Sequence, residues 1–315
     1  MRLLAYIAFV TVFAAQVFGQ TSAAPGAFAR MGFGARGIGM GNAMTAVTTG
    51  DISTFYNPAA GAFSESKVVA ATFGVLSLDR TLNFISYTQS IKPTAGFSVG
   101  LINAGVRKID GRDADGQHTE DYSTFEDQFY LAFSNKVDPR VSLGAAIKLY
   151  YSQLFDQVKS TTVGFDIGVL IQVTDDVSLG LAVQDINSKY KWDTKEIYPN
   201  PQARTTQDKF PNLRRLGLSY RFPSFPALVS AEVENSSLTT TVLRFGAEYQ
   251  VVESFVIRGG LDRQEFGDDV TGAKPTFGFG LKNSFNGWMP SLNYTYVVEA
   301  FAPNGMHIIT LSAAF

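Results

Sequence analysis

The two histidines are the clearest acid–base candidates in the chain, and neither stands in a catalytic pattern. His118 lies in a polar stretch, and His307 opens the last apolar–polar alternation on its apolar face. Neither has a partner at a metal-binding spacing such as HExxH. Ser312 is separated from His307 by an odd number of positions, so in a strand the two side chains face opposite sides and cannot form a hydrolytic pair. We therefore expect no catalytic residue and a protein that is not an enzyme.

One acidic stretch offers the best metal-binding pattern. Asp113-Ala114-Asp115-Gly116, followed by Glu120 and Asp121, resembles part of a calcium loop. Other ligands of the full D-x-[DN]-x-[DN]-G-x5-E pattern are missing, so a solvated acidic loop explains the stretch better. The chain has no cysteine, which excludes disulfides, thiol nucleophiles and thiolate metal sites. We expect no metal site and no cofactor.

Charged residues also recur at positions that alternate with large apolar residues. They are Lys148, Asp166, Arg215, Arg221, Glu232, Glu234, Arg244, Glu248, Arg258, Asp262 and Lys282. In an enclosed space such charges could line a permeation path, or they could pair with one another and brace the structure. Charges in a confined interior need partners, so we favour bracing.

The elements that position these charges are alternating segments, which dominate the chain after residue 66. In 141–151 and 163–173, one face carries mostly Val, Leu, Ile and Phe, and the other carries Gly, Ser, Lys and Asp. A secreted β-sandwich would show many Lys and Glu on its polar face, whereas Gly, Ser and Thr prevail here. Strands of about ten residues with such faces fit a barrel with lipid outside and a polar lumen. The sequence predicts an all-β transmembrane outer-membrane barrel.

The segments number about fourteen, the even count that bacterial barrels have. Their expected starts are Lys67, Thr81, Thr94, Thr124, Val141, Lys159, Ser178, Asn212, Pro226, Thr240, Ser254, Lys274, Pro290 and Gly305. Short turn-like connectors alternate with connectors of which several are long and polar, at 107–123, 187–211 and 262–273. The short ones are expected on the periplasmic side and the long ones outside the cell. The antiparallel barrel would occupy residues 67–315.

Both chain ends carry signals of this location. Residues 1–19 have a positive start at Arg2 and a short apolar core, which indicates a secretory signal peptide rather than a membrane anchor. The last segment ends on Phe315, which resembles the signal read by the barrel-insertion machinery. The expected surroundings are therefore outer-membrane lipid and the barrel-assembly machinery of a Gram-negative-type bacterium. The net charge of −2 gives no footprint for nucleic acid.

Residues 20–66 do not alternate, and their 29–62 stretch is rich in glycine and alanine. Gly37, Gly39 and Gly41 allow close backbone approach, and Asn57-Pro58-Ala59 closes the stretch. We interpret it as a plug, or hatch, inside the barrel lumen. Glycines on the polar strand faces would leave room for it, at Gly144, Gly164, Gly168, Gly180, Gly217, Gly246, Gly260, Gly278 and Gly280.

The motif Gly37-Ile38-Gly39-Met40-Gly41-Asn42-Ala43, then Thr49-Gly50-Asp51, then Asn57-Pro58-Ala59 resembles the hatch of FadL-type outer-membrane barrels. With Ala35-Arg36 in front and Phe55-Tyr56 before Asn57, it is more similar to the PorV/PorQ family of that superfamily. The resemblance implies a structural or gating hatch made by Gly37, Gly39, Gly41, Asp51, Asn57, Pro58 and Ala59.

The PorV/PorQ resemblance also implies a function in type IX secretion: accepting secreted cargo proteins or docking them to components of that system. The loops that follow Arg107 and Asn187 would be the contact surface. The alternative is a FadL-like channel that takes up hydrophobic small molecules, with the hatch as its gate. Both share the motif, so the motif leaves both open.

Overall fold

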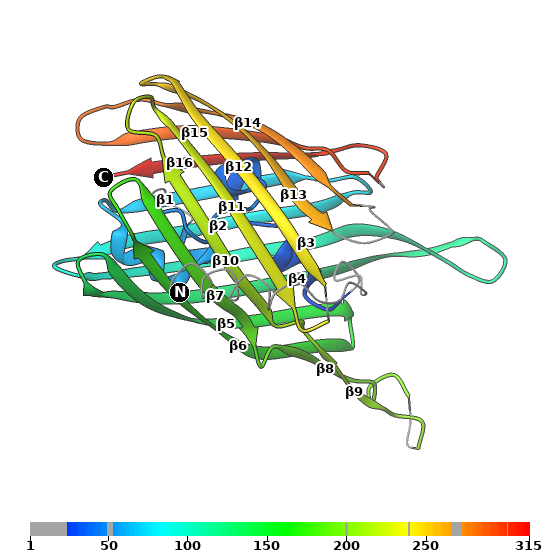
Figure 1. The fold of residues 1–315 in the computed structure, drawn as a ribbon. Helices are drawn as coiled ribbons and strands as arrows, with labels where there is room; N and C mark the ends of the chain where they lie inside the picture. Colours follow the sequence, from blue (N-terminus) through cyan, green and yellow to red (C-terminus); the bar gives the residue numbers. More distant parts are fainter. Residues whose placement is uncertain (1–23, 49–52, 199–200, 239, 266–271, 301) are drawn as a thin grey trace.

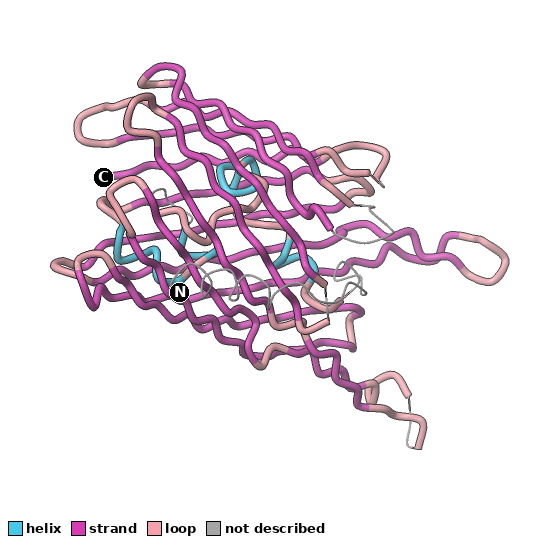
Figure 2. The backbone as a smooth tube through the Cα atoms, viewed as in Figure 1, coloured by secondary structure: helices cyan, strands magenta, loops and turns pink. Residues whose placement is uncertain are grey.

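The computed structural model describes residues 24–48, 53–198, 201–238, 240–265, 272–300 and 302–315. Short helices precede a set of long strands (Figures 1 and 2). The helical elements are η2 (Ala27–Arg30), α2 (Gly34–Gly39), α3 (Ser53–Tyr56) and η3 (Pro58–Phe63). Among the described residues, no helix combines the length and apolar character that a membrane crossing requires. The expected signal peptide lies outside the described residues.

Fourteen antiparallel strands close into one barrel, as the sequence predicted. They are β1 (Val68–Val75), β2 (Arg80–Ile91), β3 (Ala95–Arg112), β4 (His118–Asp138), β5 (Val141–Phe155), β6 (Val158–Gln172), β7 (Val177–Ile186), β10 (Leu213–Arg221), β11 (Ala227–Ser236), β12 (Thr241–Val252), β13 (Phe255–Glu265), β14 (Lys274–Lys282), β15 (Met289–Val297) and β16 (Met306–Ala314). Each strand pairs with its neighbours in chain order, and β1 closes the ring against β16. Every predicted start lies within one residue of the observed one except Thr124, because β4 begins at His118.

Two stretches predicted to be loops contain further strand structure. β3 and β4 continue past the barrel as a hairpin whose turn lies between Arg112 and His118. Within 187–211, β8 (Lys189–Asp193) and β9 (Thr205–Lys209) form a separate two-stranded sheet. Both hairpins project from the same end of the barrel (Figure 1). The prediction missed β9 and the start of β4 because their residues are mostly exposed, so apolar and polar residues do not alternate there. It missed β8 because the alternation there covers only five residues.

The outward and inward faces of the strands in the structure are those predicted from the alternation of apolar and polar residues. On β5, Leu143 and Ile147 are about half exposed, whereas Ser142 and Lys148 between them are buried. The same contrast holds on β6, where Phe165 and Ile167 face outward and Asp166 is buried. The apolar belt therefore surrounds the barrel, and the polar and small residues face a filled lumen.

The two ends of the barrel differ. Lys67 and Phe315 exchange backbone hydrogen bonds of 3.0 and 2.9 Å. The last strand therefore ends next to the point where the first strand begins. The short turns lie at this end, and the ring of Phe315 stacks on Trp288 with centroids 4.7 Å apart. Since short turns mark the periplasmic side of outer-membrane barrels, we name this end periplasmic and the end with the projecting hairpins extracellular.

Candidate functional site

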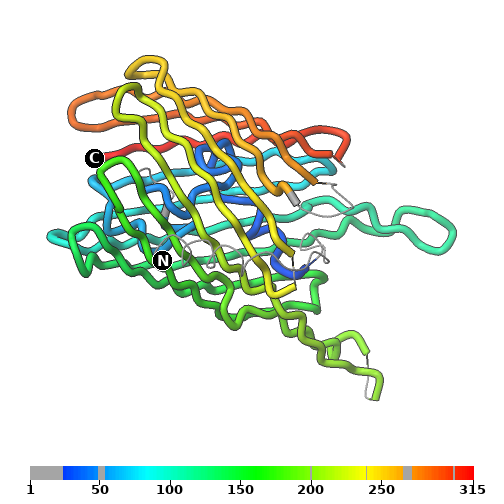
Figure 3. The backbone as a smooth tube through the Cα atoms, in the orientation of Figure 1, coloured from blue at the N-terminus to red at the C-terminus, as the bar shows by residue number. Residues whose placement is uncertain are grey.

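The described residues 24–48 and 53–63, here called the plug, run through the lumen from one end to the other (Figure 3). At the extracellular end, Gly26 packs against the ring of Phe210, whose N–H donates to the Ser188 carbonyl at 3.0 Å. At the periplasmic end, Ser142 of β5 donates its hydroxyl to the Ala59 carbonyl at 2.8 Å. The plug thus spans the whole interior.

The glycines of the hatch motif lie where the plug meets a bulky ring or the barrel wall. A side chain on Gly37 would collide with the ring of Tyr56, and one on Gly39 would meet the Thr295 hydroxyl at 2.7 Å. Gly41 has φ +59°, and a Cβ there would stand 2.5 Å from the Phe245 carbonyl oxygen. The backbone of the plug therefore touches the wall directly at this point.

Asn57 fastens the periplasmic half of the plug. Its amide nitrogen donates to the carbonyls of Thr45 at 2.9 Å and Val169 at 3.0 Å. Its Oδ1 accepts from the Ala59 N–H at 3.0 Å, which caps η3 directly before Pro58. Asp51, the remaining motif residue, lies outside the described residues.

Glycines of the strands accommodate the plug at several points. A Cβ on Gly144 would collide with the backbone of Pro58 and Ala59, and one on Gly180 would collide with the backbone of Thr45. Gly278 has a different neighbour, since it faces the Thr295 hydroxyl. Only part of the predicted glycine set therefore serves to admit the plug.

Aromatic side chains fill the half of the lumen beside β2 to β5. Phe33 of the plug stacks on Phe55 at 4.8 Å between centroids and contacts Phe84 at 4.7 Å and Tyr130 at 5.8 Å. All of these belong to one buried apolar cluster.

A second aromatic group continues this cluster to the extracellular hairpin. Phe210 lies 4.8 Å from both Tyr150 and Tyr190, and Tyr190 lies 5.0 Å from Trp192. The rings of Phe28 in the plug and Tyr150 pack edge to face, with centroids 6.4 Å apart. The base of the β8–β9 hairpin thereby covers the start of the plug.

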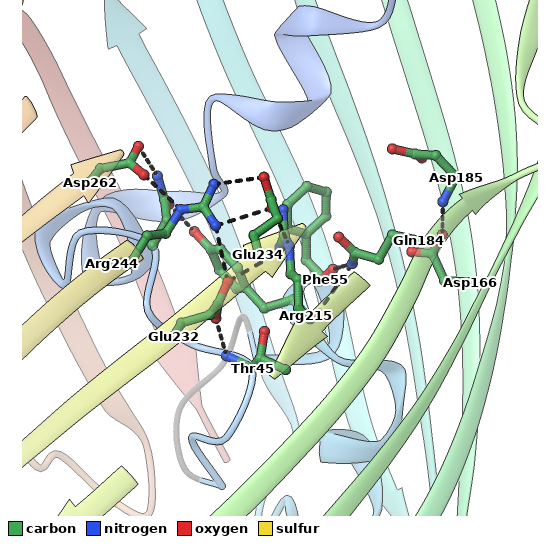
Figure 4. Close-up of polar contacts among 12 residues, drawn as sticks. Thr45, Phe55, Asp166, Gln184, Asp185, Arg215, Glu232, Glu234, Arg244 and Asp262 are labelled. Carbon is green, nitrogen blue, oxygen red and sulfur yellow. Dashed lines mark hydrogen bonds and ion pairs between the residues drawn. The ribbon is translucent and has the colours of Figure 1, made fainter. Parts of the chain in front are cut away.

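Charged side chains fill the opposite half, beside β10 to β13. Arg244 lies 3.2 Å from Glu232, 3.1 Å from Glu234 and 2.7 Å from Asp262, and Arg215 lies 2.7 Å from Glu234 (Figure 4). All five side chains are buried. Because every charge has an opposite neighbour, the cluster satisfies the condition under which ions persist away from water.

The charged cluster also holds the plug. Thr45 donates its backbone N–H to Glu232 at 3.1 Å (Figure 4), and Asn42 donates its amide to Asp262 at 3.0 Å. These contacts match the bracing interpretation of the charges and tie the plug to β11 and β13.

A separate ion pair holds α2. Arg36 lies 2.9 Å from Glu248, and Arg258 lies 2.6 Å from the same carboxylate. Arg258 also donates to the Asn293 amide oxygen at 2.7 Å. The plug contributes Arg36 to this pair, and its side chain is partly buried beside strands that are distant in sequence.

A third charged group lies near the extracellular end. Lys148 is 2.8 Å from Asp166 and 3.1 Å from Asp185, and Tyr150 donates its hydroxyl to Asp185. Strand parity would turn Asp185 outward, but its φ of 61° and the adjoining register shift turn it inward. Nothing in the alternation signals this, so the sequence did not reveal Asp185.

Other partners of the plug also escaped the sequence analysis. Gln184 donates to the Phe55 carbonyl at 2.8 Å (Figure 4). Within the plug, Arg30 donates to the Ala24 carbonyl at 2.7 Å. Arg221 and Lys282, expected in the lumen, are exposed at the periplasmic ends of their strands. Their parity is as predicted, but the lumen has already opened to water at that depth.

The residues considered for catalysis do not assemble a catalytic site. His307 is exposed, and its Nδ1 lies 2.8 Å from the Tyr294 hydroxyl. Ser312 pairs instead with the Ser291 hydroxyl at 2.6 Å. His118 hydrogen-bonds Asp110 at 2.6 Å on the projecting β3–β4 hairpin.

Asp110, His118 and Asp121 are the one group in the described part of the chain whose ligand atoms are close enough for a metal ion. All three are exposed, and Arg112 already lies 2.6 Å from Asp110. Asp113 uses its carboxylate to accept from the N–H groups of Asp115 and Gln117, which makes a turn and not a calcium loop.

Comparison with known proteins rests on structure. No model of a protein family matches the chain, and no curated protein matches it. The toluene transporter TodX of Pseudomonas putida matches with a TM-score of 0.61 at 14% identity, over 90% of this chain and 96% of that one. A FadL homologue of Pseudomonas aeruginosa matches with a TM-score of 0.65 at 14% identity, over 90% and 98%. The CymD monoaromatic hydrocarbon channel matches with a TM-score of 0.59 at 12% identity, over 90% and 97%.

These likenesses establish the fold. The chain is a FadL-like barrel of fourteen strands, and with its apolar belt it is an outer-membrane barrel of the Gram-negative type. The finer resemblance to PorV and PorQ proteins rests on the motif residues alone.

Proposed function

We propose that this barrel admits hydrophobic small molecules across the outer membrane, with the plug as its gate. The observation that carries the proposal is the buried apolar cluster, which continues from Trp192 and Phe210 under the extracellular hairpin to Phe33 and Phe55 of the plug. Its aromatic rings offer apolar and π contacts to a guest. Two of the similar structures are described as a toluene transporter and a monoaromatic hydrocarbon channel, which fits such a guest.

The rings are packed against one another, so a guest can pass only if side chains of the plug or of the hairpin base move. The charged half of the lumen gives the plug its fixed side, since Glu232 and Asp262 hold it there. Phe33 and Phe55 face the aromatic half through ring contacts, which a hydrophobic guest can replace without leaving a polar group unpaired. The hydrogen bonds of the plug on this side, from Thr54 to Ser98 and from Ser142 to Ala59, need not break for these rings to move. The route therefore follows β2 to β5.

A cysteine lock tests this function. The Cβ of Ala46 lies 3.3 Å from the position a Cβ would take on Gly217, close to the usual 3.5–4.5 Å of disulfides, and the chain has no native cysteine. Cells producing the wild type should accumulate radiolabelled toluene faster than cells without the barrel. The oxidised A46C/G217C variant ties the plug to β10 on its fixed side, so it should keep this gain because the guest displaces only side chains on the aromatic side.

The single A46C variant is the matched control and should stay active under oxidant. Equal accumulation with and without the wild-type barrel would refute the uptake function. Uptake that is lost on verified disulfide formation and restored by a reductant would refute the route along β2 to β5, because it would show that the plug must leave the charged side.

A second candidate is the docking of secreted cargo in type IX secretion. It is supported by the Arg36 and Asn57 motif and by the two hairpins, which offer exposed backbone and charges at the extracellular end. Affinity purification from outer membranes should then recover cargo with C-terminal sorting domains. Replacing 194–204 by a short glycine turn should abolish that recovery and leave toluene uptake unchanged. Normal cargo secretion in a deletion strain would eliminate this candidate.

A further inference from the structure

A hollow interrupts the lipid-facing belt on the outside of β10 to β13, which lie side by side (Figure 1). Its volume is about 440 Å³, within the range of small-molecule sites. Outward-facing side chains line it, among them Leu218, Tyr220 and Phe245. The hollow is therefore apolar and opens toward the membrane, not toward the lumen.

The register of the four strands explains its shape. Ala231 stands between its cross-strand partners Leu218 and Phe245, and one row nearer the periplasm Ala247 is paired with Gly259. Small residues thus form a diagonal floor across three strands, and large residues form the rims.

Neither crowding nor backbone conformation requires a glycine at position 259. A Cβ there would meet only the Thr276 carbonyl oxygen, at 3.8 Å, and φ lies outside the left-handed region. The next residue differs, because a Cβ on Gly260 would collide with Gly41 of the plug. A glycine inside a strand costs stability and often marks a place where a ligand comes close.

We propose that this hollow is a binding groove for one acyl chain of a bilayer phospholipid. The groove lies in the belt, where Leu218 is 46% and Phe245 is 43% exposed, so its occupant comes from the membrane. Tyr220 stands one residue before the periplasmic end of β10 and forms an aromatic group with Phe222 and Phe225. Such aromatic residues mark the membrane interface, so the chain enters from the periplasmic leaflet.

A second copy of the barrel fits the groove less well. A two-fold contact sets the same patch against itself, so two hollows would face each other and leave a void. A flexible hydrocarbon chain fills a narrow diagonal groove without such a constraint, and it is present at high concentration in the bilayer.

The test uses the full-length mature barrel in phospholipid vesicles that contain phosphatidylethanolamine with a photoactivatable diazirine on one acyl chain. Mass spectrometry of labelled peptides should place most of the label on β10 to β13. Filling the floor with Ala247→Leu or Gly259→Leu should reduce that label by about tenfold, which corresponds to 1.4 kcal/mol of binding. Ala145→Leu, the same enlargement on the belt face of β5, should leave it unchanged.

Folding of each variant is checked by the different gel mobilities of boiled and unboiled samples. Label spread evenly around the barrel, or unchanged by both groove substitutions, overturns the proposal. So does label that excess toluene displaces, which would assign the groove to a transported guest. Dimers in native mass spectrometry that either groove substitution abolishes would assign it to a second copy.

Discussion

Arg36 of the plug and Glu248 of β12 form an ion pair with Nε and Oε2 2.9 Å apart. Arg258 of β13 lies 2.6 Å from the same oxygen, so one carboxylate contacts two guanidinium groups. The pair joins residues 212 positions apart in the chain, and it adds an ionic tie to the hydrogen bonds that Thr310, Thr295 and Thr276 make with the backbone of α2. The position of α2 should therefore depend on the charge of Glu248.

Glu248→Gln should loosen α2 without unfolding the barrel. The variant leaves Arg36 and Arg258 as neighbouring like charges, and loss of charge-assisted hydrogen bonds costs about 1.5–3 kcal/mol. Amide hydrogen exchange in a peptide that covers 34–40 should become about tenfold faster or more. Lys282→Gln, at an exposed periplasmic position, is the control. Unchanged exchange in Glu248→Gln would show that α2 is held by its other contacts, which include hydrogen bonds of Ala35 to Thr310 and Thr295.

Arg244→Met should affect the barrel itself. Arg244 lies within 3.2 Å of three carboxylates. Its removal leaves Glu232 and Glu234 with Arg215 and deprives Asp262 of this ion pair. Breaking a buried pair from one side costs about 3–5 kcal/mol. The denaturant midpoint of the folded, fast-migrating gel band should fall.

The double variant Arg244→Met/Asp262→Asn should recover part of that loss, because it removes the carboxylate charge that loses its ion pair with Arg244. A double variant less stable than Arg244→Met would argue against charge imbalance as the cause.

The sequence predicted the barrel well because alternation reports burial directly. Leu143, Ser142 and their neighbours lie on the expected faces, and the strand starts follow from where the alternation begins. β9 and the extension of β4 to His118 were missed because exposed polar strands carry no burial pattern. β8 does alternate, with Tyr190 and Trp192 buried, but it is only five residues long.

The site was predictable only in part. Strand parity placed Arg244 and Glu248 inward, but it could not give their partners, because pairing across the barrel depends on register and on the course of the plug. Asp185 shows the limit most clearly. One left-handed residue reverses its side, and aspartate enters that conformation without a sequence signature.

Asn57→Ala should detach the periplasmic half of the plug. The side chain makes two donor bonds, to Thr45 and Val169, and one acceptor bond that caps η3. At about 1 kcal/mol for each hydrogen bond, the loss is about 3 kcal/mol. Proteolysis at 57–63 in detergent should then accelerate. Asn57→Asp should be equally harmful, since it sets a carboxylate against two carbonyl oxygens. If the plug of Asn57→Asp resisted proteolysis as well as that of the wild type, the side chain of Asn57 would not be what fastens the plug.

The projecting β3–β4 hairpin should respond to pH through His118. The hydrogen bond from the imidazole to Asp110 raises the pKa of His118 above its usual value. The charged pair is therefore fully present below the ordinary histidine pKa and is lost as pH rises through the raised one. An NMR titration of the ring protons should give a midpoint that falls in Asp110→Asn. An unchanged midpoint would exclude Asp110 as the cause.

Phe210→Ala should lift the base of the β8–β9 hairpin from the plug. Phe210 is buried between Tyr150, Tyr190 and Gly26, and truncating such a ring costs about 3–5 kcal/mol. Trp192, buried beside Tyr190, then becomes exposed to water. In a Trp288→Phe background Trp192 is the single tryptophan, so its emission should shift to longer wavelength. Phe225→Ala, at an exposed ring in a periplasmic turn, should give no shift. Emission unchanged in Phe210→Ala would mean that the hairpin base is held without this ring.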